Sequence, residues 1–148
     1  MNLQQNHFAT GTHPTLTPGA QYVLGFNEPD HHDQANLTPQ QAADFWPEVV
    51  KIANGLPLVA PVTAGENMHW LDQFVHLCPH CHFDYVAAHS YTCNPNSLMH
   101  YMQQLHNKYH KKVWLTEFAC AHTYDVNVQL NFMKTMLPRL EAANYVYR

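Results

Sequence analysis

The chain has 148 residues, of which 46% are hydrophobic, and its formal net charge at pH 7 is −4. This length suits one globular domain, and the composition excludes a disordered chain. Only seven lysines and arginines are present, without a basic cluster, which excludes the concentrated cationic face that nucleic acid requires. No apolar run approaches the roughly 20 residues that span a bilayer, so we expect neither a nucleic-acid nor a membrane partner.

The amino-terminal segment, residues 1–20, is polar and rich in threonine, proline and glycine, which predicts a loop or tail. Its first eight residues lack the basic region and the apolar core of a signal peptide. This indicates a cytoplasmic chain or one whose true amino terminus is missing. We place the folded domain at residues 21–148.

The first predicted strand covers residues 22–27, an apolar run that ends in Asn27-Glu28-Pro29. Pro29 ends the strand because proline has no backbone N–H to donate to the sheet ladder. Glu28 therefore lies at the carboxyl end of a strand, where α/β proteins place their chemistry.

A helix is expected next, because Thr38 can serve as its N-cap, Pro39 suits the first turn and Gln41 can complete a capping box. An apolar stripe follows at helical spacing. Pro47 lies inside this helix and is expected to kink it, and Gly55 is expected to end it.

Three further pairs of strand and helix are expected along the rest of the chain. Their strands are predicted at residues 56–62, 83–89 and 113–117. Their helices are predicted to begin near Asn67, at Asn96 or Ser97, and at Asp125. Residues 145–147 are interpreted as the start of another strand.

Four successive pairs of strand and helix, with strands that are apolar on both faces, predict an α/β fold with a parallel sheet and right-handed crossovers. Four units are half of a (β/α)₈ barrel, that is, of a TIM barrel. A doubly wound sheet is the alternative, but it usually carries a glycine-rich phosphate loop after its first strand, and the sequence has none. We therefore expect a partial barrel.

A second glutamate, Glu117, closes the last predicted strand as Glu28 closes the first. Strict alternation along these strands predicts that Val113, Leu115 and Glu117 share the face that would form a barrel interior, and that Leu24 and Phe26 share the face of the other glutamate. A single glutamate at a strand end is ordinarily a solvated loop residue. Two inward carboxylates at one sheet edge suit glycoside hydrolysis, in which one is a protonated acid and the other an ionised nucleophile or base.

Three segments carry a resemblance to a known family: Gly25-Phe-Asn-Glu-Pro-Asp30, Val86-Ala-Ala-His-Ser-Tyr91 and Val113-Trp-Leu-Thr-Glu-Phe-Ala119. They resemble the signature segments of glycoside hydrolase family 128, which belongs to the clan of retaining glycosidases with a (β/α)₈ barrel. The resemblance covers the chain from about residue 20 onward. It implies that the chain contains strands four to seven of such a barrel, and that the first three units and the eighth strand are absent.

The resemblance implies an endo-acting β-1,3-glucanase. By position, Glu28 would be the general acid/base and Glu117 the nucleophile. Asn27 would hydrogen-bond the 2-hydroxyl of the sugar. His89 and Tyr91 would line the cleft, with Tyr91 orienting Glu117.

The same resemblance implies a β-glucan polysaccharide or oligosaccharide as the partner, and neither a metal nor an organic cofactor. It also implies a secreted or cell-wall-associated parent protein. Because part of the barrel is absent, the alternative is a truncated, non-catalytic relative that binds glucan.

A Cys-X-X-Cys motif, Cys78-Pro-His-Cys81, raises the further possibility of a thiol-disulfide oxidoreductase. That chemistry needs the first cysteine at a helix amino terminus, whereas this motif follows a predicted helix. A structural zinc site would need a second ligand pair, such as Cys93 and Cys120. Those two cysteines are predicted at the opposite edge of the sheet, which argues against a shared site. We therefore consider Cys93 and Cys120 candidates for a disulfide between neighbouring loops, which would fit secretion.

Overall fold

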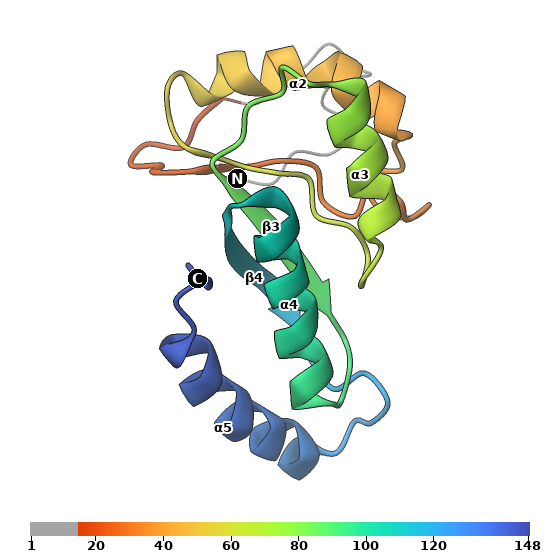
Figure 1. The fold of residues 1–148 in the computed structure, drawn as a ribbon, viewed down its shortest axis with the longest axis vertical. Coiled ribbons are helices and arrows are strands. Elements are labelled where there is room, and N and C mark those ends of the chain that lie inside the picture. Colours follow the sequence, from red (N-terminus) through yellow and green to blue (C-terminus); the bar gives the residue numbers. More distant parts are fainter. Residues whose placement is uncertain (1–14) are drawn as a thin grey trace.

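Four parallel strands and four helices alternate along residues 15–148, the part of the chain that the computed structural model describes (Figure 1). The order is β1 (Val23–Leu24), α2 (Pro39–Ala53), β2 (Leu58–Val59), α3 (Met68–Leu77), β3 (Tyr85–Ser90), α4 (Pro95–Tyr109), β4 (Lys112–Phe118) and α5 (Val126–Ala142). Residues 1–14 of the predicted tail lie outside the described residues. No helix among residues 15–148 is both long and apolar enough to cross a membrane.

The strands form one sheet in the order β1-β2-β3-β4, and each neighbouring pair is parallel. The predicted α/β fold with a parallel sheet is therefore confirmed. β1 and β2 are shorter than predicted, although a bridge between Asn27 and Val62 continues their pairing toward the carboxyl edge. At the other side of the sheet, Val113 and Val146 form a parallel bridge, so the strand expected at residues 145–147 begins there.

The helix starts follow local hydrogen bonding at the N-cap. In α2 the Thr38 hydroxyl accepts from the Gln41 N–H at 3.2 Å, and Gln41 Oε1 accepts from the Thr38 N–H at 2.9 Å, as the predicted capping box requires. Asn67 and Asp125 cap α3 and α5 as predicted. α2 ends with Asn54 in the left-handed conformation, one residue before Gly55.

The predicted start of α4 was wrong by two to three residues. The N-cap is Asn94, whose Oδ1 accepts from the backbone N–H groups of Asn96 at 2.9 Å and Ser97 at 3.3 Å. Pro95 occupies the first helical position, where its missing N–H costs nothing and its fixed φ suits the helix. Asn96 and Ser97, the two predicted N-caps, therefore lie inside the first turn of α4 and donate their N–H groups to the true N-cap.

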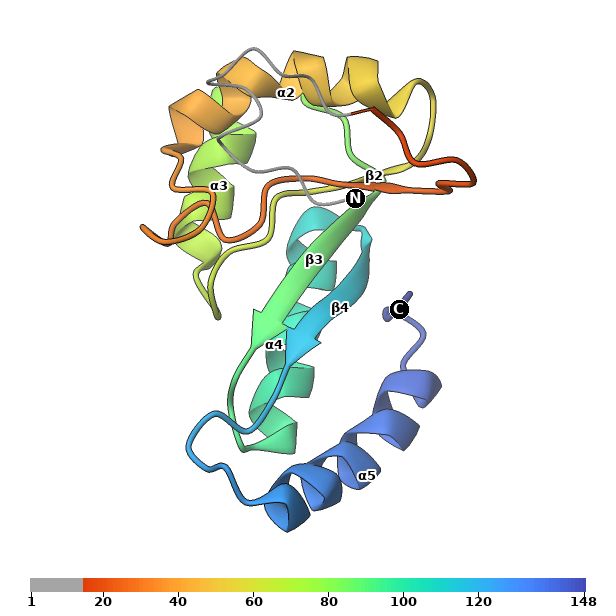
Figure 2. The same cartoon turned by 180° about the vertical axis from the view of Figure 1, so that it is seen from behind.

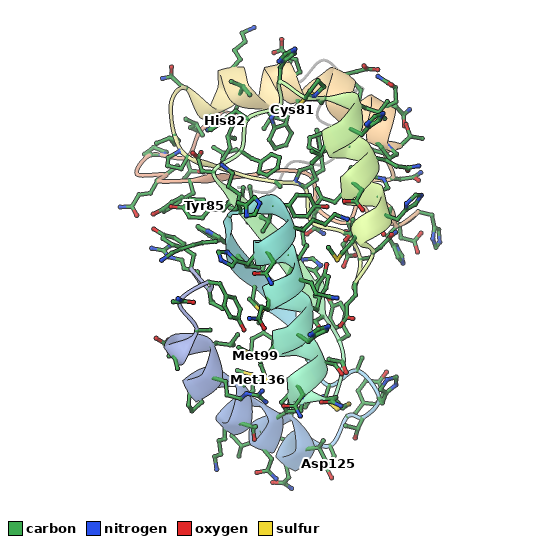
Figure 3. All side chains as sticks on the ribbon, in the orientation of Figure 1. Cys81, His82, Tyr85, Met99, Asp125 and Met136 are labelled. Atoms are coloured by element: carbon green, nitrogen blue, oxygen red, sulfur yellow. A yellow bond between two sulfur atoms is a disulfide. The ribbon has the colours of Figure 1, made fainter. Side chains whose placement is uncertain are left out.

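The sheet carries different apolar clusters on its two faces. The larger cluster joins the sheet to the helices, and α4 covers one face of β3 and β4, which lie in front of it in Figure 2. α5 packs beside α4 through the buried Met136, and Figure 3 draws Met99 and Met136 between the two helices. A smaller cluster on the other face contains Val59, Val62, Ala87 and Trp114.

The strict alternation predicted for β4 was wrong. Val113 and Leu115 belong to the larger cluster on the helix side, whereas Trp114 belongs to the smaller one. Ala88 pairs with Leu115 but His89 pairs with Glu117, so one residue of β4, Thr116, has no partner in β3. This β-bulge moves Glu117 to the face of Trp114.

The expected alternation in β1 was also wrong, because Phe26 packs in the larger cluster and Leu24 against the smaller one. At Gly25 an added Cβ would lie 2.9 Å from the Pro61 nitrogen and 3.0 Å from a ring carbon of Trp46. The absence of a side chain at Gly25 lets this segment approach its neighbours closely, immediately before the residues of the candidate site.

Candidate active site

Glu28, His89 and Glu117 come together at the carboxyl edge of the sheet, from three different strand ends. His89 Nδ1 lies 2.8 Å from Glu28 Oε1, and His89 Nε2 lies 3.5 Å from Glu117 Oε1. One oxygen of each glutamate and one nitrogen of His89 all lie within 4.8 Å of one another. The structure therefore brings together the two glutamates that the sequence singled out, with an imidazole between them.

Glu28 is held by an unusual backbone conformation. Its φ is +42°, a left-handed value that a non-glycine residue rarely adopts. Its N–H donates to the Val62 carbonyl at 2.7 Å, and its own carbonyl accepts from the His31 N–H at 3.0 Å. Backbone strain of this kind is concentrated at functional sites, and here it turns the glutamate side chain toward His89.

The side chain of His89, which the resemblance places along the cleft, is completely buried. The bulge in β4 sets Glu117 opposite it, with the Thr116 hydroxyl donating to the Ala88 carbonyl at 3.4 Å. The Glu117 side chain remains 44% exposed, compared with 11% for Glu28. The two carboxylates therefore occupy clearly different environments.

Tyr91 donates its hydroxyl to Glu117 Oε2, which is the contact expected from the sequence. Burial, together with the hydrogen bond to Glu117, raises the pKa of Tyr91 far above its usual value. Tyr91 thus stays protonated across the working range of a protein and remains a donor to the carboxylate. This interaction fixes one oxygen of Glu117 and leaves the other facing His89.

Asn27 is buried beside Glu28, and its amide is oriented by a residue that the sequence did not single out. Asn27 Nδ2 donates to Gln34 Oε1 at 3.3 Å, whereas Asn27 Oδ1 has no hydrogen-bond partner among the described residues. A buried amide oxygen without a partner is ready to accept from a ligand hydroxyl or from water. No pattern in the sequence distinguishes Gln34 from other polar loop residues.

Asp30, which lies two residues after Glu28, was not among the site residues predicted from the sequence. Its carboxylate accepts from the Ala64 N–H at 2.8 Å and from Asn67 Nδ2 at 2.7 Å. It thereby ties the loop after β1 to the loop after β2 and to the start of α3. An acidic residue directly after the Asn27-Glu28-Pro29 turn was the available signal.

Within residues 15–148, two groups of side chains have the donor types of a metal site. Glu28, His89 and Glu117 form one of them, and the exposed loop residues His31, His32 and Asp33 form the other. In the first group, Glu28 and Glu117 already hydrogen-bond to His89 and to Tyr91. We therefore interpret the first group as a hydrogen-bonded carboxylate pair.

Disulfides join all four cysteines of the chain. Cys93 and Cys120 are linked, with Cα atoms 4.3 Å apart, and the bond ties the loop after β3 to the loop after β4. Cys78 and Cys81 form the second disulfide, before the amino end of β3. Cys78 is the C-cap of α3, so no helix amino terminus stabilises its thiolate, and no cysteine remains free to bind zinc.

The two disulfides are expected to differ in their effect on stability. Removing the bond between Cys93 and Cys120, which are 27 residues apart, by a double substitution to alanine should cost about 3.5 kcal/mol in the chain-entropy relation. Removing the bond between Cys78 and Cys81 should cost about 2 kcal/mol in the same relation. At about 2–4 °C per kcal/mol, calorimetry under oxidising conditions should show the larger drop in Tm for the first pair. An equal or reversed order would contradict this prediction.

The fold and the site together define an α/β protein with a carboxylate pair at the carboxyl edge of a parallel sheet. The family model for the glycosyl hydrolase catalytic core matches residues 2–148. The chain therefore belongs to this family, and its structural relatives are members of glycoside hydrolase family 128, as the sequence resemblance indicated.

Two solved structures illustrate the similarity. An endo-β-1,3-glucanase from Sorangium cellulosum is 30% identical, with a TM-score of 0.81, over 96% of this chain and 60% of that one. An endo-β-1,3-glucanase from Amycolatopsis mediterranei, in complex with laminaritriose, is 29% identical, with a TM-score of 0.76, over 87% of this chain and 60% of that one.

A curated relative, Alkali-sensitive linkage protein 1 of Schizosaccharomyces pombe, is 30% identical over 125 residues. The match covers 80% of this chain but only 23% of that protein. The chain thus spans about three fifths of the two glucanase chains and about a quarter of the curated relative.

Proposed function

We propose that this chain is the catalytic part of a retaining glycoside hydrolase that cleaves β-1,3-glucan, with Glu28 as the general acid/base and Glu117 as the nucleophile. The observation that carries the proposal is the approach of the two glutamates, whose nearest ligand oxygens lie within 4.8 Å on either side of His89. The activity of the similar Sorangium and Amycolatopsis glucanases supplies the substrate class.

The separation of the carboxylates favours retention of configuration. Retaining glycosidases hold their two carboxyl groups about 5–5.5 Å apart, whereas inverting enzymes leave about 6.5–9.5 Å for a water molecule. One oxygen of Glu28 and one oxygen of Glu117 lie within 4.8 Å of each other, which supports the shorter of these two spacings. A direct attack on the anomeric carbon by Glu117, followed by hydrolysis of the glycosyl ester, accounts for this spacing.

The environments of the two glutamates support the roles assigned to them. Glu28 is almost buried at the carboxyl edge of the sheet, a position that suits the general acid that gives its proton to the leaving oxygen. Glu117 is more exposed and accepts the Tyr91 hydroxyl, which suits an ionised nucleophile. Asn27 Oδ1 is free to accept the 2-hydroxyl of the sugar, a hydrogen bond that strengthens in the transition state.

We also infer that the four strands correspond to part of a (β/α)₈ barrel. The strands are parallel and lie in sequence order, and the site lies at their carboxyl edge, as in barrel enzymes. In this arrangement the smaller apolar cluster around Trp114 would face the barrel interior.

The test is to incubate the purified chain with laminari-oligosaccharides and to follow the products by proton NMR. A retaining mechanism releases the β-anomer first, and mutarotation to the α-anomer follows. Initial release of the α-anomer would overturn the retaining mechanism. Binding of oligosaccharide without any hydrolysis would instead support the alternative of a non-catalytic glucan-binding protein.

A further inference from the structure

We propose that His31, His32 and Asp33 form a binding site for a divalent transition-metal ion, Cu²⁺ or Ni²⁺, in the loop that joins β1 to α2. The three side chains supply two imidazole nitrogens and one carboxylate oxygen. The site begins three residues after Glu28 but shares no ligand with the candidate catalytic group. The proposed hydrolysis of glucan needs no metal, so this proposal is independent of the proposed function.

The three ligand groups already lie close together. One ligand atom from each of His31, His32 and Asp33 lies within 4.8 Å of the others. Within residues 15–148, the only other group of this kind is the one that contains the two candidate catalytic glutamates. Ligands of one ion, each at about 2.1 Å, can be at most about 4.2 Å apart. The side chains of His32 and Asp33 are exposed, so small rotations can close this difference.

The contact between His32 and Asp33 indicates the coordination geometry. His32 Nε2 lies 3.0 Å from Asp33 Oδ2. An ion about 2.1 Å from both atoms would see them at an angle of about 90°, which is the angle between neighbouring ligands in a tetragonal site. A tetrahedral zinc ion would need an angle of about 109° and thus a separation of about 3.4 Å. The observed spacing therefore favours Cu²⁺ or Ni²⁺.

His31 directs an unprotonated nitrogen toward the same place. Its Nδ1 accepts from the backbone N–H of Asp33 at 3.3 Å, so in the neutral ring the proton is on Nε2. This hydrogen bond is long and exposed, and a metal ion can replace it. The ring of His31 stacks on that of His32, with centroids 4.9 Å apart and planes 24° apart. Two neutral rings stack without charge repulsion, and the neutral imidazole is the form that binds metal.

The backbone of the loop holds these residues in a defined conformation. The His31 N–H donates to the Glu28 carbonyl at 3.0 Å, and the Gln34 N–H donates to the His31 carbonyl at 3.1 Å. The Ala35 N–H donates to the Asn27 carbonyl at 3.2 Å, which closes the loop onto the end of β1. Because the backbone is ordered before an ion binds, binding loses less conformational entropy.

The donor set also predicts which ions the site rejects. Imidazole nitrogen suits copper, nickel and zinc, and Cu²⁺ binds tightest among the divalent first-row metals. Ca²⁺ and Mg²⁺ take oxygen ligands, of which Ca²⁺ needs six to eight. The site offers these ions only the carboxylate of Asp33. We therefore expect Ni²⁺ to compete with Cu²⁺ for the site, and Ca²⁺ not to compete.

The first test locates the ion. The chain is prepared without a polyhistidine tag, labelled with ¹⁵N, freed of metal with a chelator and titrated with substoichiometric Cu²⁺. The paramagnetic ion broadens the amide signals that lie near it. We expect the signals of residues 30–34 to broaden first. First broadening around any other histidine of the chain would overturn the proposal.

The second test measures the affinity for Cu²⁺ by calorimetry in competition with a chelator. Partners that only orient a ligand are worth about 10–100-fold in metal affinity, and His32→Ala, which removes a ligand, is expected to cost at least as much. His82→Ala is the matched control. His82 is also exposed, and its Nε2 lies 3.1 Å from Asp84 Oδ1, but among residues 15–148 this pair belongs to no group of three ligands.

The control variant should keep the affinity within about twofold. Unchanged affinity in His32→Ala, or an equal loss in both variants, would overturn the proposal. Displacement of Cu²⁺ by excess Ca²⁺ would show that the carboxylate alone holds the ion, and it would overturn the role of the two imidazoles. The ¹⁵N spectrum of each variant without metal checks that the affinities are measured on folded protein.

Discussion

Replacing Glu117 with glutamine is expected to lower kcat on β-1,3-glucan by about 10⁴-fold or more, because without the nucleophilic carboxylate the covalent glycosyl-enzyme cannot form. Glutamine nearly matches glutamate in shape and can still accept the Tyr91 hydroxyl, so the fold should not change. Release of reducing sugar is the measurement. Glu66→Gln is the matched control: Glu66 is an exposed glutamate at the same edge that contacts Ser90, and its replacement should leave kcat within about twofold.

A smaller substitution at the same position tests the assigned role. In Glu117→Gly, added azide can occupy the space of the lost carboxylate and attack the anomeric carbon from that side. The expected product is the α-glucosyl azide, which NMR identifies. Formation of the β-glucosyl azide would show that Glu117 lies on the opposite side of the sugar, and the roles of the two glutamates would have to be exchanged.

Replacing Glu28 with glutamine is expected to lower kcat on β-1,3-glucan by about 10²–10⁴-fold, which is the usual contribution of a general acid. The amide has no acidic proton to give to the leaving oxygen. An aryl β-glucoside with a good leaving group does not need that proton in the first step. The first step should therefore remain fast, and a burst of phenol should be followed by slow turnover.

The same variant should accumulate the glycosyl-enzyme, because Glu28 is also the base that activates water in the second step. Mass spectrometry of the quenched protein should then show one sugar unit on the peptide that contains Glu117. A variant that loses activity equally on glucan and on the aryl glucoside, with no accumulated intermediate, would contradict the role of Glu28 as acid and base.

Much of the fold could be predicted because local signals are strong where they occur. The capping box of Thr38 and Gln41 defined the start of α2, and Asp125 defined that of α5. The start of α4 was missed because Asn94, Asn96 and Ser97 are all acceptable caps, and only the position of Pro95 distinguishes them. Sequence alone therefore located the elements better than their ends.

For the candidate site, the sequence located the glutamates but not the geometry between them. Strand ends follow from Pro29 and from the end of the apolar run at Glu117, so both carboxylates could be placed at one edge. The bulge at Thr116 could not be foreseen, because it depends on pairing with β3 and leaves no mark in the residue pattern. The burial of His89 likewise depends on three strands that meet in space.

The bulge has a consequence for how the site tolerates change. Its geometry depends on one more residue in β4 than in the facing part of β3, and not on the identity of any one side chain there. Substitutions at Thr116 keep that count. If the same sequence paired with β3 in simple alternation, without the bulge, Glu117 would turn toward the helices. The orientation of the candidate nucleophile is therefore set by the pairing of β4 with β3, which accommodates the extra residue between Leu115 and Glu117.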